Sequence, residues 1–160
     1  APRHPRRTSE VIAAINASGI AFAQRSFGDH PGPATPIYLA DKMGEMTAWY
    51  RLAALTFVGG TLADHGGHTP FEPAHEGSAI THGPHVSNQR DAFASLTDAK
   101  AALPVSDAED LAQAFQTLAQ PARIAQLAAS AQATLFTGSE GRTAKSISEM
   151  LDFKQRDFQS

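Results

Sequence analysis

The chain has 160 residues, a formal net charge of −3 and a sequence pI near 6.1. That length is typical of one domain with a real core, and the acidic balance argues against a dedicated nucleic-acid binder. The absence of cysteine excludes disulfides and thiolate chemistry. Because no apolar run approaches the roughly 20 residues that a membrane helix needs and no signal-peptide pattern is present, we expect a soluble piece.

The chain opens with the basic segment APRHPRR. Thr8 or Ser9 can cap a helix that runs to about Ser18, with Gly19 as its stop. The basic residues before it are either a solvated surface or, through the fork-shaped guanidinium of Arg3, a phosphate contact.

The next elements are a strand at 20–25, an exposed loop at 28–36 and a strand at 37–40. Asp41 then predicts a helix cap. The apolar face of that helix would carry Met43, Met46, Tyr50 and Ala53. Gly44 weakens the first turn of that helix, so a glycine there needs a reason. Close approach of a ligand to the backbone is one such reason, and a planar base is one such ligand. Glu45 is either a ligand contact or a carboxylate that favours the helix dipole.

The central stretch follows a strand at 54–58. Gly66 and Gly67 allow a sharp turn and close approach of a ligand. Thr69, Pro70 and Glu72 form a capping-box pattern, which predicts a helix beginning at Pro70. Its N-terminus would offer an anion site for which phosphate is the expected guest, although most such turns bind nothing.

The remaining predicted strands lie at 78–82 and 100–105. The remaining predicted helices lie at 88–96, from the cap Ser106-Asp107 to Gln120, and at 122–136. A last segment, 143–153, has apolar residues at helical spacing. Alternating strands and helices predict a Rossmann-like α/β fold, with a parallel sheet, helices on both faces and ligand at the carboxyl ends of the strands. We expect residues 1–160 to form a single domain.

Three blocks resemble one known family. VGGTLADHGGHTPFEPAHEG followed by GPHVSNQRD is similar to the GGS-x-HGGHNPLEPA and GPH-x-x-NFRD signatures of 3-deoxy-D-manno-octulosonic acid (Kdo) transferase, a lipopolysaccharide glycosyltransferase. APRHPRR resembles that family's PRHPER segment, and Asp41 to Glu45 resembles its D-T-M-G-E segment. The blocks occur in the family's order over residues 1 to about 135, and they cover the C-terminal half of such an enzyme.

The resemblance implies the donor-binding half of a GT-B glycosyltransferase. The residues carried over as contacts to CMP or the donor are Pro2, Arg3, Met43, Gly44, Glu45, Thr69, Pro70, Phe71 and Glu72. The residues carried over as donor-sugar contacts or braces between loops are Gly66, Gly67, His68, His85 and Asn88. Glu72 is either the capping-box partner or a ribose contact, and the resemblance favours ribose.

By the same resemblance, the intact enzyme transfers Kdo from CMP-Kdo to a lipid A precursor with inversion, at the cytoplasmic face of the bacterial inner membrane. Its general base, acceptor site and membrane association belong to the N-terminal domain. The chain begins without methionine or a leading strand, so we expect an excised fragment that contains no catalytic residue, binds nucleotide weakly and is inactive alone.

Three departures from the family pattern are Thr69 for Asn, Arg6 for Glu and Gln89 for Phe. Two alternatives remain: a nucleotide-sugar epimerase domain of similar architecture, and a non-catalytic module that holds metal with its histidines. The seven histidines include only a loose His65-x-x-His68 spacing. We therefore expect no metal and no cofactor besides the substrate CMP-Kdo, and we assign His65, His75 and His82 to the surface or to local packing.

Overall fold

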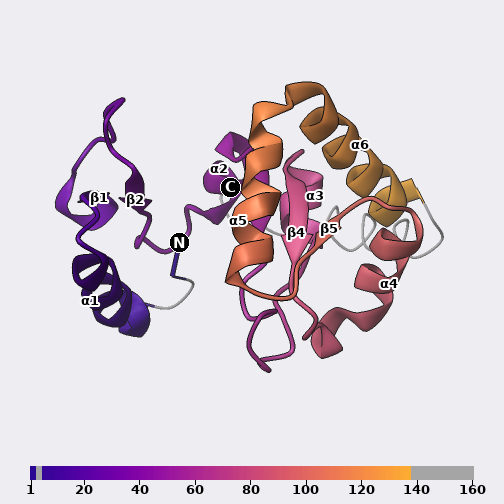
Figure 1. Ribbon diagram of the computed structural model, residues 1–160, viewed down its shortest axis with the longest axis horizontal. Coiled ribbons are helices and arrows are strands. Elements are labelled where there is room, and N and C mark those ends of the chain that lie inside the picture. The colour runs from indigo at the N-terminus through magenta and orange to yellow at the C-terminus, as the bar shows by residue number, and fades with distance from the viewer. Residues whose placement is uncertain (3–4, 138–160) are drawn as a thin grey trace, which may run out of the picture. The chain divides into compact units, whose positions relative to one another are not determined.

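The computed structural model describes residues 1–2 and 5–137 (Figure 1). The chain forms two compact units, Ala1–Ala48 and Trp49–Ser160. Arg3 and the predicted segment at 143–153 lie outside the described residues.

The first unit begins with the 3-10 turn η1 (Pro5–Arg7) and the helix α1 (Thr8–Ser18). Gly19 ends α1 in the left-handed conformation, with φ of 68°, which confirms the predicted helix and its stop. The predicted cap at Thr8 or Ser9 is wrong. The N-cap is Arg7, which makes no capping bond through its side chain, because η1 leads directly into α1 and the chain is already helical there.

Two short strands follow, β1 (Phe22–Gln24) and β2 (Ile37–Leu39), which pair in parallel with Gln24 opposite Leu39. The 3-10 turn η2 (Arg25–Phe27) comes directly after β1. Both strands lie inside their predicted ranges. Their carboxyl ends therefore meet at one edge of this two-stranded sheet, where η2 and the turn at 41–45 lie.

The helix predicted to begin at Asp41 begins instead at Met46, as α2 (Met46–Leu52). Residues 41–45 form a turn in which Gly44 has φ of 82°, a left-handed conformation that interrupts a helix. Met43 is 67% exposed and does not belong to a core. Asp41 serves another purpose, because its carboxylate accepts hydrogen bonds from η2.

The second unit contains a parallel sheet in the order β3-β4-β5, formed by β3 (Leu55–Phe57), β4 (Ala79–His82) and β5 (Leu103–Pro104). Parallel neighbours with helical crossovers confirm the predicted α/β class. Each strand is shorter than its predicted range.

The helices and 3-10 turns of this unit are α3 (Phe71–His75), η3 (Ser87–Gln89), α4 (Arg90–Asp98), α5 (Ala108–Gln116), η4 (Thr117–Ala119) and α6 (Pro121–Thr137). Asp107 caps α5 as predicted, since its Oδ1 accepts the Asp110 N–H at 2.9 Å. The α-helix ends at Gln116 and gives way to η4, so the predicted extension to Gln120 is wrong. The α3 helix begins at Phe71, one residue later than predicted.

The core of the second unit lies on both sides of β4. Ala79 and Ile80 are fully buried, and as neighbours on a strand they face opposite sides of the sheet. The Ala79 side packs with Leu55, Leu103, Ile124, Leu127 and Ala128, the last three from α6. The Ile80 side packs with Val58, Ala74, Ala92, Phe93, Leu96, Ala101, Ala102, Ala131 and Leu135, chiefly from α3, α4 and the end of α6. Helices therefore cover both faces of the sheet, as predicted.

Candidate functional site

Two loops meet at the carboxyl end of the three-stranded sheet. The β3 loop, residues 59–70, follows β3, and the β4 loop, residues 83–88, follows β4; both lie at the lower end of the sheet in Figure 1. Asn88 joins them by donating its N–H to the Gly66 carbonyl at 2.9 Å and its side-chain amide to the Gly67 carbonyl at 3.2 Å. The structure thus brings together Gly66, Gly67, His85 and Asn88, although up to 22 positions separate them in the sequence.

Gly66 and Gly67 of the β3 loop are required by packing between the loops. Gly66 and Gly67 both have φ of 76°, which favours glycine. A Cβ at Gly66 would lie 2.5 Å from Oδ1 of Asn88, and one at Gly67 would lie 2.9 Å from Cγ2 of Thr61. These contacts support the loop-bracing role of Gly66, Gly67 and Asn88, while their contact with a donor sugar stays a prediction.

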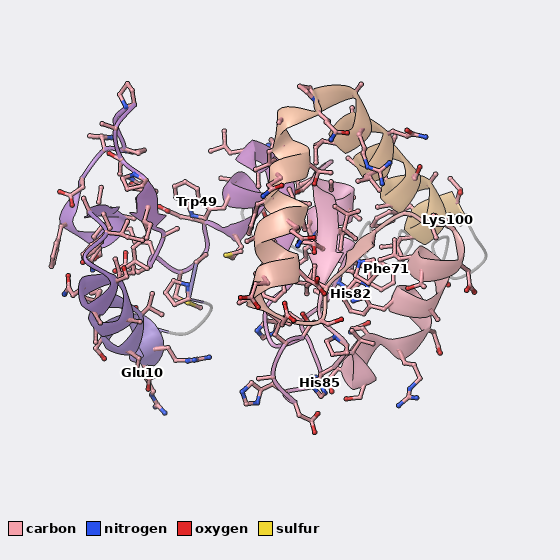
Figure 2. The ribbon with its side chains drawn as sticks, in the orientation of Figure 1. Glu10, Trp49, Phe71, His82, His85 and Lys100 are labelled. Carbon is pink, nitrogen blue, oxygen red and sulfur yellow. The ribbon has the colours of Figure 1, made fainter. Side chains whose placement is uncertain are left out.

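The two histidines carried over from the resemblance lie on these loops. His68 is exposed, and its N–H donates to the Gly59 carbonyl at 3.0 Å. His85 is half-buried, with Nδ1 3.6 Å from Oδ1 of Asp64, and Figure 2 shows it at the end of the unit where the loops lie. Both rings therefore lie close enough to the surface for contact with a ligand.

The segment from Thr69 to Glu72 enters α3. The Thr69 hydroxyl accepts the Phe71 N–H at 3.3 Å, but the N-cap of α3 is Pro70 and no side chain caps the helix, so the predicted capping box of Thr69 and Glu72 is wrong. Phe71 packs edge-on against Phe136 of α6, with ring centroids 6.0 Å apart, and Pro70 is fully buried. Glu72 is exposed, and within the described part of the chain its carboxylate makes no hydrogen bond or ion pair. Packing of Pro70 and Phe71 therefore anchors the start of α3, and the side chain of Glu72 stays exposed.

The predicted anion site at the start of α3 has few donors. The helix spans five residues, Pro70 has no N–H, and the Phe71 N–H already bonds to Thr69. A helix dipole grows with the number of aligned peptide units, so a helix this short contributes little. A phosphate contact at this helix stays a prediction.

In the first unit, the Glu45 carboxylate is held by Arg25. Arg25 Nε lies 3.0 Å from Oε2 of Glu45, and Nη2 lies 3.0 Å from Oε1. The hydrogen bonds from Arg25 lower the pKa of Glu45, and burial opposes them only in part. Met43 and Gly44 lie exposed in the same turn, and a Cβ at Gly44 would meet no atom within 4 Å. This turn is therefore open to a ligand, with Glu45 oriented by Arg25.

Sequence reasoning missed Arg25. The available signal was its place at the end of the first predicted strand, because Glu45 follows the end of the second and the carboxyl ends of neighbouring parallel strands lie side by side. Pro2, the remaining nucleotide-contact candidate of this unit, is half-buried, whereas Arg3 lies outside the described residues.

Asp41 organises the same edge of the first unit. Its Oδ1 accepts the Ser26 N–H at 2.9 Å, and its Oδ2 accepts the Ser26 hydroxyl and the Gln24 side-chain amide, both at 2.7 Å. Burial alone would raise the pKa of Asp41, but these hydrogen bonds outweigh it and lower the pKa. Asp41 therefore ties the turn at 41–45 to η2 and helps set the position of Glu45.

His82, assigned from the sequence to the surface or to local packing, is buried at the end of β4. Its ring lies 4.5 Å from that of Phe93 between centroids, and its Nδ1 lies 2.8 Å from the Gly83 carbonyl. Its Nε2 is buried and has no hydrogen-bond partner among the residues that the structure describes. Burial lowers the pKa of His82, and the bond to Gly83 opposes that shift only in part. Local packing is therefore the correct assignment.

Within residues 1–2 and 5–137, no three His, Asp or Glu side chains gather closely enough to hold a metal ion. In the same residues, no helix combines the length and apolar character needed to cross a bilayer.

Comparison with known proteins gives several relatives that carry the same name. The chain is 38% identical to the 3-deoxy-D-manno-octulosonic acid transferase of Bordetella pertussis over 154 residues, which are 94% of this chain and 36% of that protein. It is 35% identical to the enzyme of the same name from Haemophilus influenzae over 118 residues, 73% of this chain and 28% of that protein. The chain thus spans about a third of the length of these curated relatives. No family model matches it.

A solved structure is also similar. The C-terminal CMP-Kdo binding domain of WaaA from Acinetobacter baumannii superimposes with a TM-score of 0.80 at 34% identity, covering 84% of this chain and 71% of that one. The similarity therefore extends over most of both chains and includes the fold. On these grounds, the chain belongs to the 3-deoxy-D-manno-octulosonic acid transferase family.

Proposed function

We propose that this chain is the donor-binding domain of an inverting glycosyltransferase, which moves Kdo from CMP-Kdo to a lipid A precursor in lipopolysaccharide biosynthesis. The observation that carries the proposal is the similarity, at a TM-score of 0.80 and 34% identity, to a domain described as binding CMP-Kdo. Neither the epimerase nor the non-catalytic module is favoured, because the relatives from Bordetella pertussis and Haemophilus influenzae are named as Kdo transferases.

The motif residues have complementary properties for binding a nucleotide sugar. Glu72 presents an exposed carboxylate without a protein partner among the described residues, which suits ribose hydroxyls as hydrogen-bond donors. The loops joined by Asn88 present His68 and His85, whose ring N–H groups can donate to the sugar's carboxylate. Taken by itself, the first unit exposes an apolar side chain and an open glycine in its Met43–Glu45 turn, and both suit the face of a base.

The chemistry of the intact protein follows from the bond that must break. An acceptor hydroxyl attacks the anomeric carbon of Kdo, the bond from that carbon to the CMP phosphate oxygen breaks, and CMP leaves with the electron pair. The hydroxyl proton passes to a general base, which we assign to a carboxylate of the N-terminal domain. In this scheme the present chain binds and orients the donor, and the acceptor site and the association with the cytoplasmic face of the inner membrane belong to that other domain.

The proposal is tested by thermal denaturation of the chain with CMP, CMP plus a chelator, UMP and zinc. A ligand that binds only the folded state raises the melting temperature by mass action. We expect CMP to raise it more than UMP does, and the chelator to leave the shift unchanged because we propose no metal requirement. A shift with zinc and none with CMP would contradict the proposal and favour a metal-binding module.

A further inference from the structure

The side chain of Thr61 lies at the crossing of the two loops. Thr61 is fully buried, and its hydroxyl donates to the Val58 carbonyl at 2.6 Å and accepts the Gly83 N–H at 2.8 Å. One hydroxyl thus links the end of β3 to the first residue of the β4 loop. Its donor and one acceptor site are both used, in a place without exposure to solvent.

The backbone of Thr61 makes further links to the β4 loop and to the far part of the β3 loop. Its carbonyl accepts the His85 N–H at 2.9 Å. A Cβ at Gly83 would lie 2.2 Å from that carbonyl oxygen, and a Cβ at Gly67 would lie 2.9 Å from the Thr61 methyl group. Three backbone segments therefore meet around one side chain with no space to rearrange, as expected in a close-packed interior.

Thr61 and Asn88 join the β3 and β4 loops at two different places, one buried next to the sheet and one on the outer side. Asn88 bonds to the carbonyls of Gly66, Gly67 and His65 on the outer side. Thr61 holds Gly83 and His85 on the buried side, where the loops leave the sheet. The side chains that we propose for the donor, His68 and His85, lie on the loops held in this way.

We propose that Thr61 is a positioning residue for the donor site: its hydroxyl sets the relative geometry of the β3 and β4 loops without touching the ligand. This inference rests on the proposed function. Loss of the hydroxyl leaves the Gly83 N–H and the Val58 carbonyl without their partner in a buried place, and the β4 loop must move to find water or another acceptor. That movement displaces His85, whose N–H bonds to the same residue.

The test compares variants that differ by one oxygen. Thr61→Ser and Thr61→Ala both lose the methyl group, but only Thr61→Ser keeps the hydroxyl. Thr61→Val removes the hydroxyl and preserves the side-chain shape, so it supplies a second variant if Thr61→Ala does not fold. Thr56→Ala is the matched control, because Thr56 is a part-buried β3 threonine whose hydroxyl bonds to Ser78 at 2.7 Å, away from both loops.

The dissociation constant for CMP-Kdo, which carries the sugar carboxylate that we propose for His68 and His85, is measured by calorimetry below the melting temperature of each variant. We expect Thr61→Ala and Thr61→Val to bind CMP-Kdo about tenfold more weakly than the wild type, and Thr61→Ser and Thr56→Ala to stay within about threefold. Recovery of affinity by serine distinguishes positioning through the hydroxyl from a general loss of packing. Equal affinity of the alanine, valine and serine variants, or an equal loss in Thr56→Ala, would overturn the proposal.

A second measurement does not depend on the ligand. Amide hydrogen exchange of Gly67, Gly83 and His85 is followed by NMR without CMP, and we expect faster exchange in Thr61→Val or Thr61→Ala than in Thr61→Ser. Unchanged exchange would show that the hydroxyl does not hold the loops. If the wild type fails to bind CMP while the exchange changes as expected, the proposed function is wrong and the linkage of the loops by Thr61 is right.

Discussion

Arg25 holds both carboxylate oxygens of Glu45, through Nε to Oε2 and Nη2 to Oε1, each at 3.0 Å. The two residues follow neighbouring parallel strands and lie 20 positions apart in the chain. A two-point contact of this kind orients a carboxylate as well as neutralising it. The Glu45 carboxylate is therefore held in one orientation.

Replacing Arg25 with lysine tests that orientation. An ammonium group cannot donate to both oxygens in the planar geometry of a guanidinium, so we expect Arg25→Lys to weaken CMP binding by about threefold or more. Calorimetry measures the affinity. Arg51→Lys is the control, because Arg51 also pairs with a glutamate, Glu76, at 2.7 Å. The same affinity in Arg25→Lys as in the control would show that the pair is not needed to orient Glu45.

Two glutamates of the α3 segment should respond differently to the same change. Glu72 is exposed and without a side-chain partner among the described residues, whereas Glu76 is 11% exposed and accepts from Arg51. We expect Glu72→Gln to weaken CMP binding without changing the free energy of unfolding. Glu76→Gln should lower that free energy by about 0.5 kcal/mol, because the partner Arg51 is largely solvated, and leave CMP binding unchanged. Calorimetry and urea denaturation measure the two effects, and an unchanged CMP affinity in Glu72→Gln would argue against the ribose contact.

Two glycines with similar backbone conformations should differ in their tolerance of alanine. Gly66 has φ of 76° and Gly77 has φ of 80°, but only Gly66 faces an obstacle, Asn88 Oδ1 at 2.5 Å from an added Cβ. Urea denaturation should show Gly77→Ala destabilised by about 1 kcal/mol from the left-handed backbone alone, and Gly66→Ala by about 3 kcal/mol because the collision is added.

The double variant Gly66→Ala with Asn88→Ala identifies the source of that difference. Since Asn88 is the obstacle, the loss in the double variant should be smaller than the sum of the two single losses. Additive losses would show that Gly66 is required for another reason.

Because His82 is buried, we expect the free energy of unfolding to depend on pH. Its pKa in the folded chain lies below the ordinary value of 6.5 because the ring is buried. As the pH falls below about 6.5, the unfolded chain therefore takes up a proton at His82 before the folded chain does, and the free energy of unfolding decreases. Above that value His82 is neutral in both states and this contribution to stability is complete.

Urea denaturation between pH 5 and pH 8 measures this dependence. His82→Asn, which retains an N–H donor for the Gly83 carbonyl, should reduce the slope, and His65→Asn, at an exposed position, should not. An unchanged slope in His82→Asn would assign the dependence to other groups.

Local patterns predicted local structure well. Gly19 stopped α1, Asp107 capped α5, and alternating elements indicated a parallel α/β fold, because each signal acts through a few neighbouring residues. The helix expected from Asp41 was wrong for a non-local reason. Asp41 has partners from β1 and η2, which the sequence places 15 to 17 positions away, and these partners compete with capping.

The sequence by itself determined the parallel α/β class, the motif blocks and their order, and the family that these blocks identify. Only the tertiary structure decided which side chains of those motifs are exposed at the surface and which are engaged in contacts within the protein. Asn88 against Gly66, Arg25 against Glu45 and Thr61 against Gly83 are pairs 20 to 22 residues apart. Such pairs form because parallel strands bring their carboxyl ends to one edge of a sheet, and no local periodicity records which loop atoms will then meet.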